Sequence, residues 1–345
     1  MAKKATNAEN GGSLRDRLLK TSTIKETSIL GDSKIFQPQT FYDTGIPLIN
    51  LALSTEVDKG LFPGITIIAG PSKHFKSKFA LELLSGFLKN SEKGIGLIYD
   101  NEFGSPAKYF ESSSIDTDRV IYSPIMNLEE LKFDLVKQLE HITKDDEVCI
   151  LIDSIGNLAS KKELDDALDG ESKQDMTRAK VLKSIFRMIT PYVKMKNIPL
   201  IGIGHTYQTQ EMYSKSVVSG GTGGYYSADN IWIVGRQQRK EGNEVEGYDY
   251  IINVEKSRFV KEKTKFPITV TFDGGIDKWS GMLELAVELG YIGKAGKSTY
   301  QVIDRETGEL IGKEYKKDEL SNNDNFWNPL MTDSFKKALK EYCSL

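Results

Sequence analysis

Residues 61–79 decide the fold of this chain: Leu61-Phe-Pro-Gly-Ile-Thr-Ile-Ile-Ala-Gly-Pro-Ser-Lys-His-Phe-Lys-Ser-Lys-Phe79. A β-branched run at 65–69 ends at Gly70, and a compact loop then leads to Lys76 and Ser77. Apolar pairs recur at helical spacing over 79–88. A strand, a phosphate-sized loop, Lys-Ser and a helix form the layout of a nucleotide-binding P-loop.

This order of elements suits the binding of a phosphate chain. Backbone N–H groups at a helix start converge on an anion, and the helix dipole adds to their attraction. Lys76 would contact the outer phosphates, and the Ser77 hydroxyl would bind Mg²⁺. The candidate nucleotide-binding residues of this loop are Gly70, Pro71, Ser72, Lys73, His74, Phe75, Lys76 and Ser77.

The loop departs from the usual motif at one position, because Phe75 stands where the second glycine is expected. Glycine there permits a positive φ or a close approach of backbone to phosphate. We expect Phe75 to provide neither. The alternative for the loop alone is a strand–turn–helix unit in which Lys-Ser is only a solvated helix start.

Two further apolar runs end in carboxylates. Residues 96–100 lead to Asp100-Asn101-Glu102, and residues 148–153 end at Asp153. Carboxylates at the C-terminal ends of buried parallel strands lie where α/β sheets bind ligands. Glu102 is therefore a candidate to polarise an attacking water, and Asp153 a candidate to support Mg²⁺. Solvated strand ends are the alternative for each run taken alone.

Composition sets the remaining bounds. The 345 residues, 39% hydrophobic and 28% charged, are enough for a large core plus a smaller domain. The first residues lack an apolar signal core, and no run approaches membrane-spanning length, so we expect a cytosolic protein without membrane contact. With only two cysteines, Cys149 and Cys343, we do not expect a disulfide framework. The three histidines are scattered, which argues against a zinc site.

The net charge of −3 neither requires nor excludes a nucleic-acid partner. One dense basic run stands out, formed by Lys256, Arg258, Lys261, Lys263 and Lys265. Its alternative interpretation is a solvated strand edge protected by lysines.

The N-terminal residues predict an arm. Residues 1–12 are small and polar and are expected to be disordered, and Ser13 can cap a short helix with a Leu14/Leu18/Leu19 stripe. An extended segment around 33–37 follows. The arm would pack either on a neighbouring subunit or back on its own core, and these residues do not decide between the two.

The rest of the core alternates helices and strands. We predict helices at 128–142 and 176–189, a strand at 199–204, and strands at 231–234, 250–254 and 268–272. The charged stretch 165–173 is predicted to be a mobile loop, and the glycine-rich stretch 207–226 a long loop with a functional role. Beyond Gly274-Gly275 we expect a helix at 282–289, a hairpin turn at 304–308 and a last helix at 335–342.

Five separate stretches resemble the UvsX recombinases, the RecA-like strand-exchange proteins of T4-type bacteriophages. They are residues 70–77, 99–104, 152–163, 205–212 and 253–258, in the order that the family has them. The family's loop also carries Phe before the Lys. The resemblance extends from about residue 14 to 342.

The resemblance implies an α/β fold: a RecA-like P-loop ATPase core with a central, mostly parallel sheet, an N-terminal oligomerisation arm and a small α+β C-terminal domain. The implied boundaries are 1–40, 41–275 and 276–345. ATP, with Mg²⁺ held by Ser77 and Asp153, would lie between adjacent subunits of a helical filament.

By the same resemblance, Glu102 activates water, Tyr109 stacks on adenine and His205 senses the γ-phosphate. Lys256 and Arg258 match the pair of cations that enters the neighbour's ATP site. The implied DNA-binding loops contain Lys173, Arg178, Tyr207, Tyr213, Lys215, Gly220 and Gly221.

The resemblance therefore implies an ATP-dependent recombinase that forms helical filaments on single-stranded DNA, pairs it with duplex DNA, and serves phage recombination, repair and recombination-dependent replication. Expected partners are a recombination mediator and a single-strand DNA-binding protein, in the cytoplasm of the infected bacterial host. A ring helicase and a non-catalytic ATP-gated filament are the alternatives. The T4-type relatives carry an acidic C-terminal tail, which is not expected here because the chain stops at Leu345. Either the lineage lacks this tail or the chain is a shortened form.

Overall fold

The computed structural model describes residues 13–33, 40–105, 107–170, 177–208, 216–219, 222–241, 244–272 and 275–345. The chain divides into two units, residues 1–39 and 40–345. In the first, helix α1 (Leu14–Thr21) begins as predicted with a capping box, in which Ser13 and Asp16 satisfy each other's backbone N–H groups. Leu14 and Leu18 are 63% and 61% exposed. A short 3₁₀ helix, η1 (Leu30–Asp32), follows, and the predicted extended segment lies largely outside the described residues.

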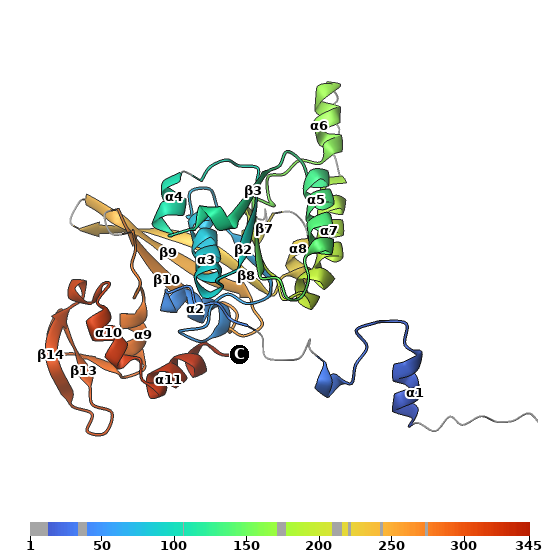
Figure 1. Cartoon of the computed structure of the whole chain (residues 1–345). Coiled ribbons are helices and arrows are strands. Elements are labelled where there is room, and N and C mark those ends of the chain that lie inside the picture. The colour runs from blue at the N-terminus through green and yellow to red at the C-terminus, as the bar shows by residue number, and fades with distance from the viewer. Residues whose placement is uncertain are drawn as a thin grey trace, which may run out of the picture. The chain divides into compact units, whose positions relative to one another are not determined.

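The second unit contains a nine-stranded sheet in the order β11-β10-β9-β8-β1-β5-β4-β2-β3 (Figure 1). The strands from β8 to β3 in this order run parallel, whereas β9, β10 and β11 continue the sheet antiparallel. The strands are β1 (Gly64–Ala69), β2 (Ile95–Asp100), β3 (Val120–Pro124), β4 (Val148–Asp153), β5 (Pro199–Gly204), β8 (Asn230–Glu241), β9 (Glu244–Lys256), β10 (Lys265–Thr271) and β11 (Gly275–Ile276). The predicted mostly parallel α/β sheet is confirmed.

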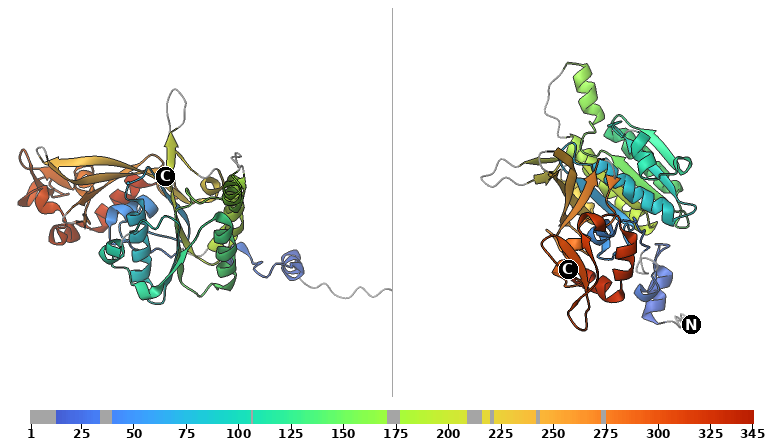
Figure 2. Two further views of the ribbon diagram at one scale, coloured as in Figure 1. Left: turned by 90° about the horizontal axis from the view of Figure 1, so that it is seen from above. Right: turned by 90° about the vertical axis from the view of Figure 1, so that its left-hand side faces the viewer.

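Helices cover both faces of this sheet. Strands β1, β4 and β5 are buried along their whole length, as expected for parallel strands with helices on each side. Ile68 of β1 packs on one face with α2 (Pro47–Ser54) and α3 (Lys76–Asn90). Ile67 packs on the other with α5 (Leu128–His141) and α7 (Thr177–Met195). Figure 2 shows the same two layers from further directions.

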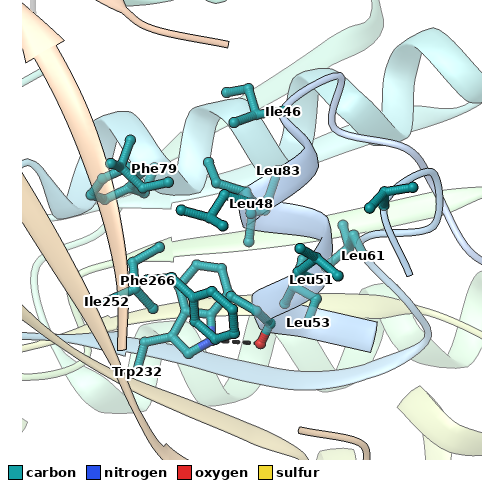
Figure 3. Packing of buried hydrophobic residues seen from close by; sticks show 14 of the residues in the cluster. Ile46, Leu48, Leu51, Leu53, Leu61, Phe79, Leu83, Trp232, Ile252 and Phe266 are labelled. Atoms are coloured by element: carbon teal, nitrogen blue, oxygen red, sulfur yellow. Dashed lines mark hydrogen bonds between the residues drawn. The ribbon is translucent and has the colours of Figure 1, made fainter. Parts of the chain in front are cut away.

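The first of these layers is held together by aromatic and leucine side chains from distant parts of the chain (Figure 3). Trp232 of β8 is fully buried, and its indole N–H donates to the Ala52 carbonyl of α2 over 3.3 Å. Leu48 and Leu51 of α2 and Phe266 of β10 are likewise buried in this cluster. Helix α2 is thereby fixed against β8 and β10 on this face of the sheet.

The C-terminal residues form the predicted small α+β region. Strands β12 (Ile292–Lys294), β13 (Thr299–Ile303) and β14 (Leu310–Lys316) make an antiparallel sheet, accompanied by α9 (Met282–Glu288), α10 (Asp324–Leu330) and α11 (Asp333–Cys343). The predicted turn is confirmed: the Gly308 N–H donates to the Asp304 carbonyl over 2.8 Å, and Gly308 has a φ of 75°. Trp279 stacks on Trp327 with ring centroids 5.6 Å apart.

Both predicted loops contain regular structure, which corrects the sequence prediction. Helix α6 (Lys161–Leu168) covers the start of the first, because Ser160 caps it by accepting the Glu163 N–H over 3.1 Å. In the second, β6 (Thr206–Gln208) pairs with β7 (Ser216–Val218), and α8 (Thr222–Ser227) follows. Most of the remainder of both loops, residues 171–173, 209–215 and 220–221, lies outside the described residues.

The sequence also missed the edge strand β3, helix α4 (Ala107–Ser112) and the 3₁₀ turn before β3. Helix α7 continues past its predicted end at 189 to Met195, with Pro191 inside it. Within the part of the chain that the structure describes, no helix combines the length and apolar character needed to cross a membrane.

Candidate active site

The loop 70–75 joins the C-terminal end of β1 to the first residue of α3, as the sequence predicts. It borders a cavity of about 910 Å³, whose lining includes residues 72–77 together with Glu102, Tyr109, Asp153 and His205. Gly70 permits a close approach, since a Cβ there would lie 2.8 Å from the Val234 carbonyl oxygen. Residues predicted from four separate stretches therefore meet at one cavity.

Phe75 has the left-handed backbone conformation that glycine normally supplies, with φ 62° and ψ 16°. The expectation that this residue could not take a positive φ was therefore wrong. Aromatic contacts hold the side chain: its ring stacks on Tyr250 at 4.9 Å between centroids and meets Phe79 and Tyr109 edge-on. These contacts offset the steric cost of the backbone.

Lys76 is 7% exposed and donates from Nζ to the Pro71 carbonyl of its own loop over 2.8 Å. Burial lowers the pKa of Lys76, and the negative charges of Glu102 and Asp153 act in the opposite direction. The ammonium group thus spans the loop at the place where phosphate oxygens would enter, next to the carboxylates that would balance its charge.

Ser77 and Asp153 face each other across α3 and β4, with the Ser77 hydroxyl donating to Asp153 Oδ2 over 2.7 Å. Burial raises the pKa of Asp153 to about 6, although the hydrogen bond from Ser77 opposes that shift. Asp153 Oδ1 is buried and has no hydrogen-bond partner among the described residues. An orphaned carboxylate oxygen beside a hydroxyl fits a Mg²⁺ ion that takes its other ligands from phosphate and water.

Glu102 lies in the loop that follows β2, where Asp100 Oδ1 accepts the Glu102 and Phe103 N–H groups over 2.8 and 2.9 Å. Its Oε1 accepts hydrogen bonds from Asn157 Nδ2 and His205 Nε2, both over 2.9 Å, and from the Ser154 hydroxyl. Burial acts to raise the pKa of Glu102, but the Ser154 and His205 hydrogen bonds and the nearby charges of His205 and Lys76 lower it on balance. Glu102 is thus an ionised acceptor at neutral pH.

Tyr109 lies on α4, lines the cavity and contacts Phe75. Lys78 fixes α4 against α3, because its buried ammonium donates to Ser112 and Ser113 and pairs with Glu82 at 2.8 Å. Sequence reasoning missed Lys78, although its position in α3, next to the Lys-Ser pair, was a usable signal.

Sequence reasoning also missed three residues of the β8–β9 hairpin: Tyr248 and Tyr250, which line the cavity, and Arg236, which contacts Tyr248 and the P-loop. Tyr248 and Tyr250 are two residues apart on β9, so their side chains share one face of the strand. Arg236 of β8 lies over the Tyr248 ring at 4.7 Å and donates to the Lys73 carbonyl over 3.1 Å. The alternation of the two tyrosines was the only local signal for this wall of the cavity.

Lys256 and Arg258 lie at the edge of the sheet formed by the N-terminal ends of the parallel strands, whereas the P-loop lies at their C-terminal ends. Strand β8 starts beside β1, with Asn230 next to Thr66, and β9 returns antiparallel so that Lys256 pairs with Ile231. Arg258 pairs with buried Asp229, whose other oxygen accepts the Ile65 N–H over 2.8 Å. Strand β1, six residues or about 20 Å long, separates this edge from the P-loop, so these cations do not belong to the chain's own cavity.

The buried carboxylate of Asp229 also forms an ion pair with a lysine of α7. Lys194 of α7 contacts Asp229 at 2.5 Å, and Lys256 donates to the Tyr225 carbonyl over 2.8 Å. Two cationic side chains therefore pair with one buried carboxylate at this edge, and the charge of Asp229 also acts on Lys256.

Two of the predicted DNA-binding residues are described. Tyr207 of β6 is 55% exposed. Arg178, near the start of α7, donates to the Leu158 carbonyl over 2.8 Å and to the Gly156 carbonyl. Lys173, Tyr213, Lys215, Gly220 and Gly221 lie outside the described residues.

Comparison with known proteins places this site in a family. Residues 279–339 match the family model described as the C-terminal domain of the bacteriophage T4 recombination and repair protein. The chain is 48% identical over 331 residues to the recombination and repair protein of Enterobacteria phage T4, covering 95% of this chain and 85% of that protein. This protein belongs to the UvsX family.

More distant relatives of this UvsX-family protein are RecA proteins. The chain is 27% identical over 328 residues to RecA of Mycoplasma mycoides, covering 91% of this chain and 88% of that protein. It is 25% identical over 305 residues to RecA of Aquifex aeolicus, covering 87% and 84%. Because these relatives match 91% and 87% of the chain, and the structure has the mostly parallel sheet with helices on both faces, the RecA-like fold of this UvsX-family protein is established.

Proposed function

We propose that this protein is a recombinase that assembles on single-stranded DNA, hydrolyses ATP there, and acts in recombination, repair and recombination-dependent replication of phage DNA. One observation carries the proposal. The cavity holds Lys76, Ser77, Glu102, Asp153 and His205, whereas Lys256 and Arg258 lie at the far edge of the same sheet. A site divided in this way suits an enzyme whose subunits complete one another.

The residues on the cavity side divide the work of hydrolysis. Bound MgATP supplies the γ-phosphoryl group that is transferred to water. Lys76 and the loop N–H groups hold the phosphate chain, and Ser77 with the orphaned Asp153 Oδ1 holds the metal. Glu102, ionised at neutral pH, would orient the water and accept its proton, and Tyr109, which lines the cavity, would stack on the adenine.

The residues at the far edge act on the neighbour. Lys256 and Arg258 would enter the next protomer's cavity and stabilise charge on the transferred phosphoryl group, as an arginine finger does in trans. Such a front-to-back contact does not close on itself and generates an open helix. ATP therefore strengthens the contact between protomers, and hydrolysis weakens it.

The proposed domains also suit an assembly of protomers joined front to back. We propose residues 1–40 as an oligomerisation arm, 41–275 as the ATPase core and 276–345 as a small C-terminal domain. In the arm, α1 exposes Leu14 and Leu18 on one face, and a helix of 8 residues is too short to persist alone in water. The neighbouring protomer is the partner proposed for this face.

DNA would run along the filament axis, held mainly through its phosphates so that base edges stay free for pairing. The loops that lead from α6 to α7 and from β6 to β7 are the proposed contacts, with Tyr207 available to stack on bases. A phage recombination mediator and a single-strand DNA-binding protein are the proposed partners in the host cytoplasm.

Electron microscopy and ATPase assays test the proposal. With single-stranded DNA and a non-hydrolysable ATP analogue, the protein is expected to form open helical filaments, and hydrolysis is expected to rise with added single-stranded DNA. Closed hexameric rings that unwind duplex directionally would favour the helicase alternative. If Glu102→Gln leaves strand exchange and turnover at the normal rate, the assignment of the base is wrong.

A further inference from the structure

One oxygen of the Glu102 carboxylate carries its side-chain hydrogen bonds. Glu102 Oε1 accepts all three of the side-chain hydrogen bonds that the described residues donate to this carboxylate, from Ser154, Asn157 and His205. A carboxylate oxygen has two lone-pair directions, so Oε1 is saturated. Among the described residues, none donates to Oε2. The Glu102 carboxylate is therefore held through Oε1, and Oε2 is left to accept a hydrogen bond from a water or a ligand.

Asn157 contributes to this arrangement from an exposed position in the loop after β4. Its backbone is fixed from two sides. Arg178 donates to the carbonyls of Gly156 and Leu158, which flank Asn157. Gly156 lies against His205, since a Cβ built on it would be 3.0 Å from both His205 N and Cδ2.

The two fixing residues lead into the two loops proposed to contact DNA. Arg178 is the second residue of α7, directly after the loop that follows α6. His205 directly precedes β6, and its carbonyl accepts the Ser219 N–H over 2.7 Å just beyond β7. Each loop is thus joined, through Arg178 or His205, to a donor of Glu102.

We propose that Asn157 is a positioning residue for Glu102: it holds Oε1, together with Ser154 and His205, so that Oε2 faces the reacting water, and it transmits the position of the first loop to the base. The proposal rests on the function proposed above. Asn157 touches no nucleotide atom in this scheme and acts only through Glu102. It supplies a route by which DNA binding sets the rate of hydrolysis.

The experiment compares Asn157→Ala and Asn157→Asp with Asn328→Ala, which removes an exposed amide on α10 as a control. The Asp variant keeps the size of the side chain, removes the N–H donor and places a negative charge beside Glu102. Steady-state ATPase is measured with and without single-stranded DNA, and DNA binding by anisotropy of a labelled oligonucleotide. Both Asn157 variants are expected to lose about 10-fold in DNA-stimulated kcat, with smaller loss in DNA-free kcat. KM for ATP, DNA affinity and the control are expected to stay within about twofold of wild type.

A second variant pair shows whether Asn157 acts through Glu102. Adding Asn157→Ala to Glu102→Gln is expected to cause no further loss, because the base that Asn157 positions is already absent. A full additional loss in the double variant, a DNA-stimulated rate equal to wild type in the single variants, or an equal fractional loss with and without DNA would each overturn the proposal. Normal turnover by Glu102→Gln itself would instead show that the base assigned under the proposed function is wrong, an outcome distinct from a failure of the role of Asn157.

Discussion

Phe75 and Tyr250 stack nearly parallel, with ring centroids 4.9 Å apart and an interplanar angle of 18°. The contact joins the P-loop to β9, and it accompanies a left-handed backbone at Phe75. At Phe75 the positive φ lowers the stability of the fold, and the aromatic contact raises it.

These opposing effects predict that Phe75→Gly is more stable than Phe75→Ala, the reverse of the usual order in a helix. Phe75→Ala loses the ring contacts, keeps the strained backbone and is expected to lower the free energy of unfolding by about 2–3 kcal/mol. Phe75→Gly loses the same contacts but relieves the strain, so it should be about 1 kcal/mol more stable than the Ala variant. Urea unfolding measures both.

Phe133 is the matched control for this comparison, since it is 74% exposed in the interior of α5. In a helix interior Gly is about 1 kcal/mol less stable than Ala, so Phe133→Gly should unfold more easily than Phe133→Ala. If the Phe75 pair shows the same order as the Phe133 pair, the backbone strain at Phe75 is absent.

Asp153 predicts a pH dependence of stability in the nucleotide-free, magnesium-free protein. Burial raises the pKa of Asp153 from 3.8 to about 6, so between these values the folded state binds a proton that the unfolded state has released. Stability therefore falls as pH rises through this window, by about 3 kcal/mol at most, and stays lower above it. Thermal unfolding in EDTA between pH 4 and 8 measures the effect.

Asp153→Asn removes this titration. The variant should be more stable than wild type at about pH 7, show a flatter profile across the window, and lose magnesium-dependent hydrolysis. Wild-type and Asn profiles that run parallel throughout would show that Asp153 titrates at an ordinary pKa.

Completion of the site in trans predicts rescue between two inactive variants. Glu102→Gln lacks the base of its own cavity, and Arg258→Ala lacks the cation for its neighbour. In mixed filaments some contacts pair an intact Glu102 with an intact Arg258 from the adjacent protomer. Random mixing at equal amounts should restore up to about a quarter of wild-type turnover.

The control for rescue replaces Arg258→Ala by the variant that carries both substitutions. No contact in its mixture with Glu102→Gln contains an intact base, so turnover should stay at background. A rescue mixture no faster than the mean of its two components would place Arg258 outside the neighbour's site.

The exposed face of α1 predicts a loss of assembly. Leu14→Glu with Leu18→Glu places two charges on this face and should raise the protein concentration needed for filament formation by about tenfold or more. The thermal stability of the monomer should not change. Sedimentation and electron microscopy measure assembly.

Lys20→Glu is the control, because it changes charge on the other side of the same helix. Normal filaments from the leucine double variant, combined with a less stable monomer, would mean that the arm packs on its own core.

The sequence alone determined the features that depend on near neighbours in the chain. β-Branched runs predicted β1, β4 and β5, and helical spacing predicted α3 and α5, because a strand or helix face follows from residues two to four apart. The order of glycine, lysine and serine located the phosphate loop, and strand-end carboxylates singled out Glu102 and Asp153. The short edge strand β3 and helix α4 were missed because their local patterns are weak.

Tertiary structure decided which distant side chains meet. The order of strands in the sheet brings Tyr250 onto Phe75, and this contact stabilises the left-handed backbone of Phe75. No local sequence pattern predicts that contact. It brings Asn157 and His205 onto one oxygen of Glu102 from separate loops. The antiparallel return of β9 carries Arg258 away from the cavity of its own chain. Such contacts depend on how strands are ordered and how loops pack, and residues far apart in sequence carry no local record of that order.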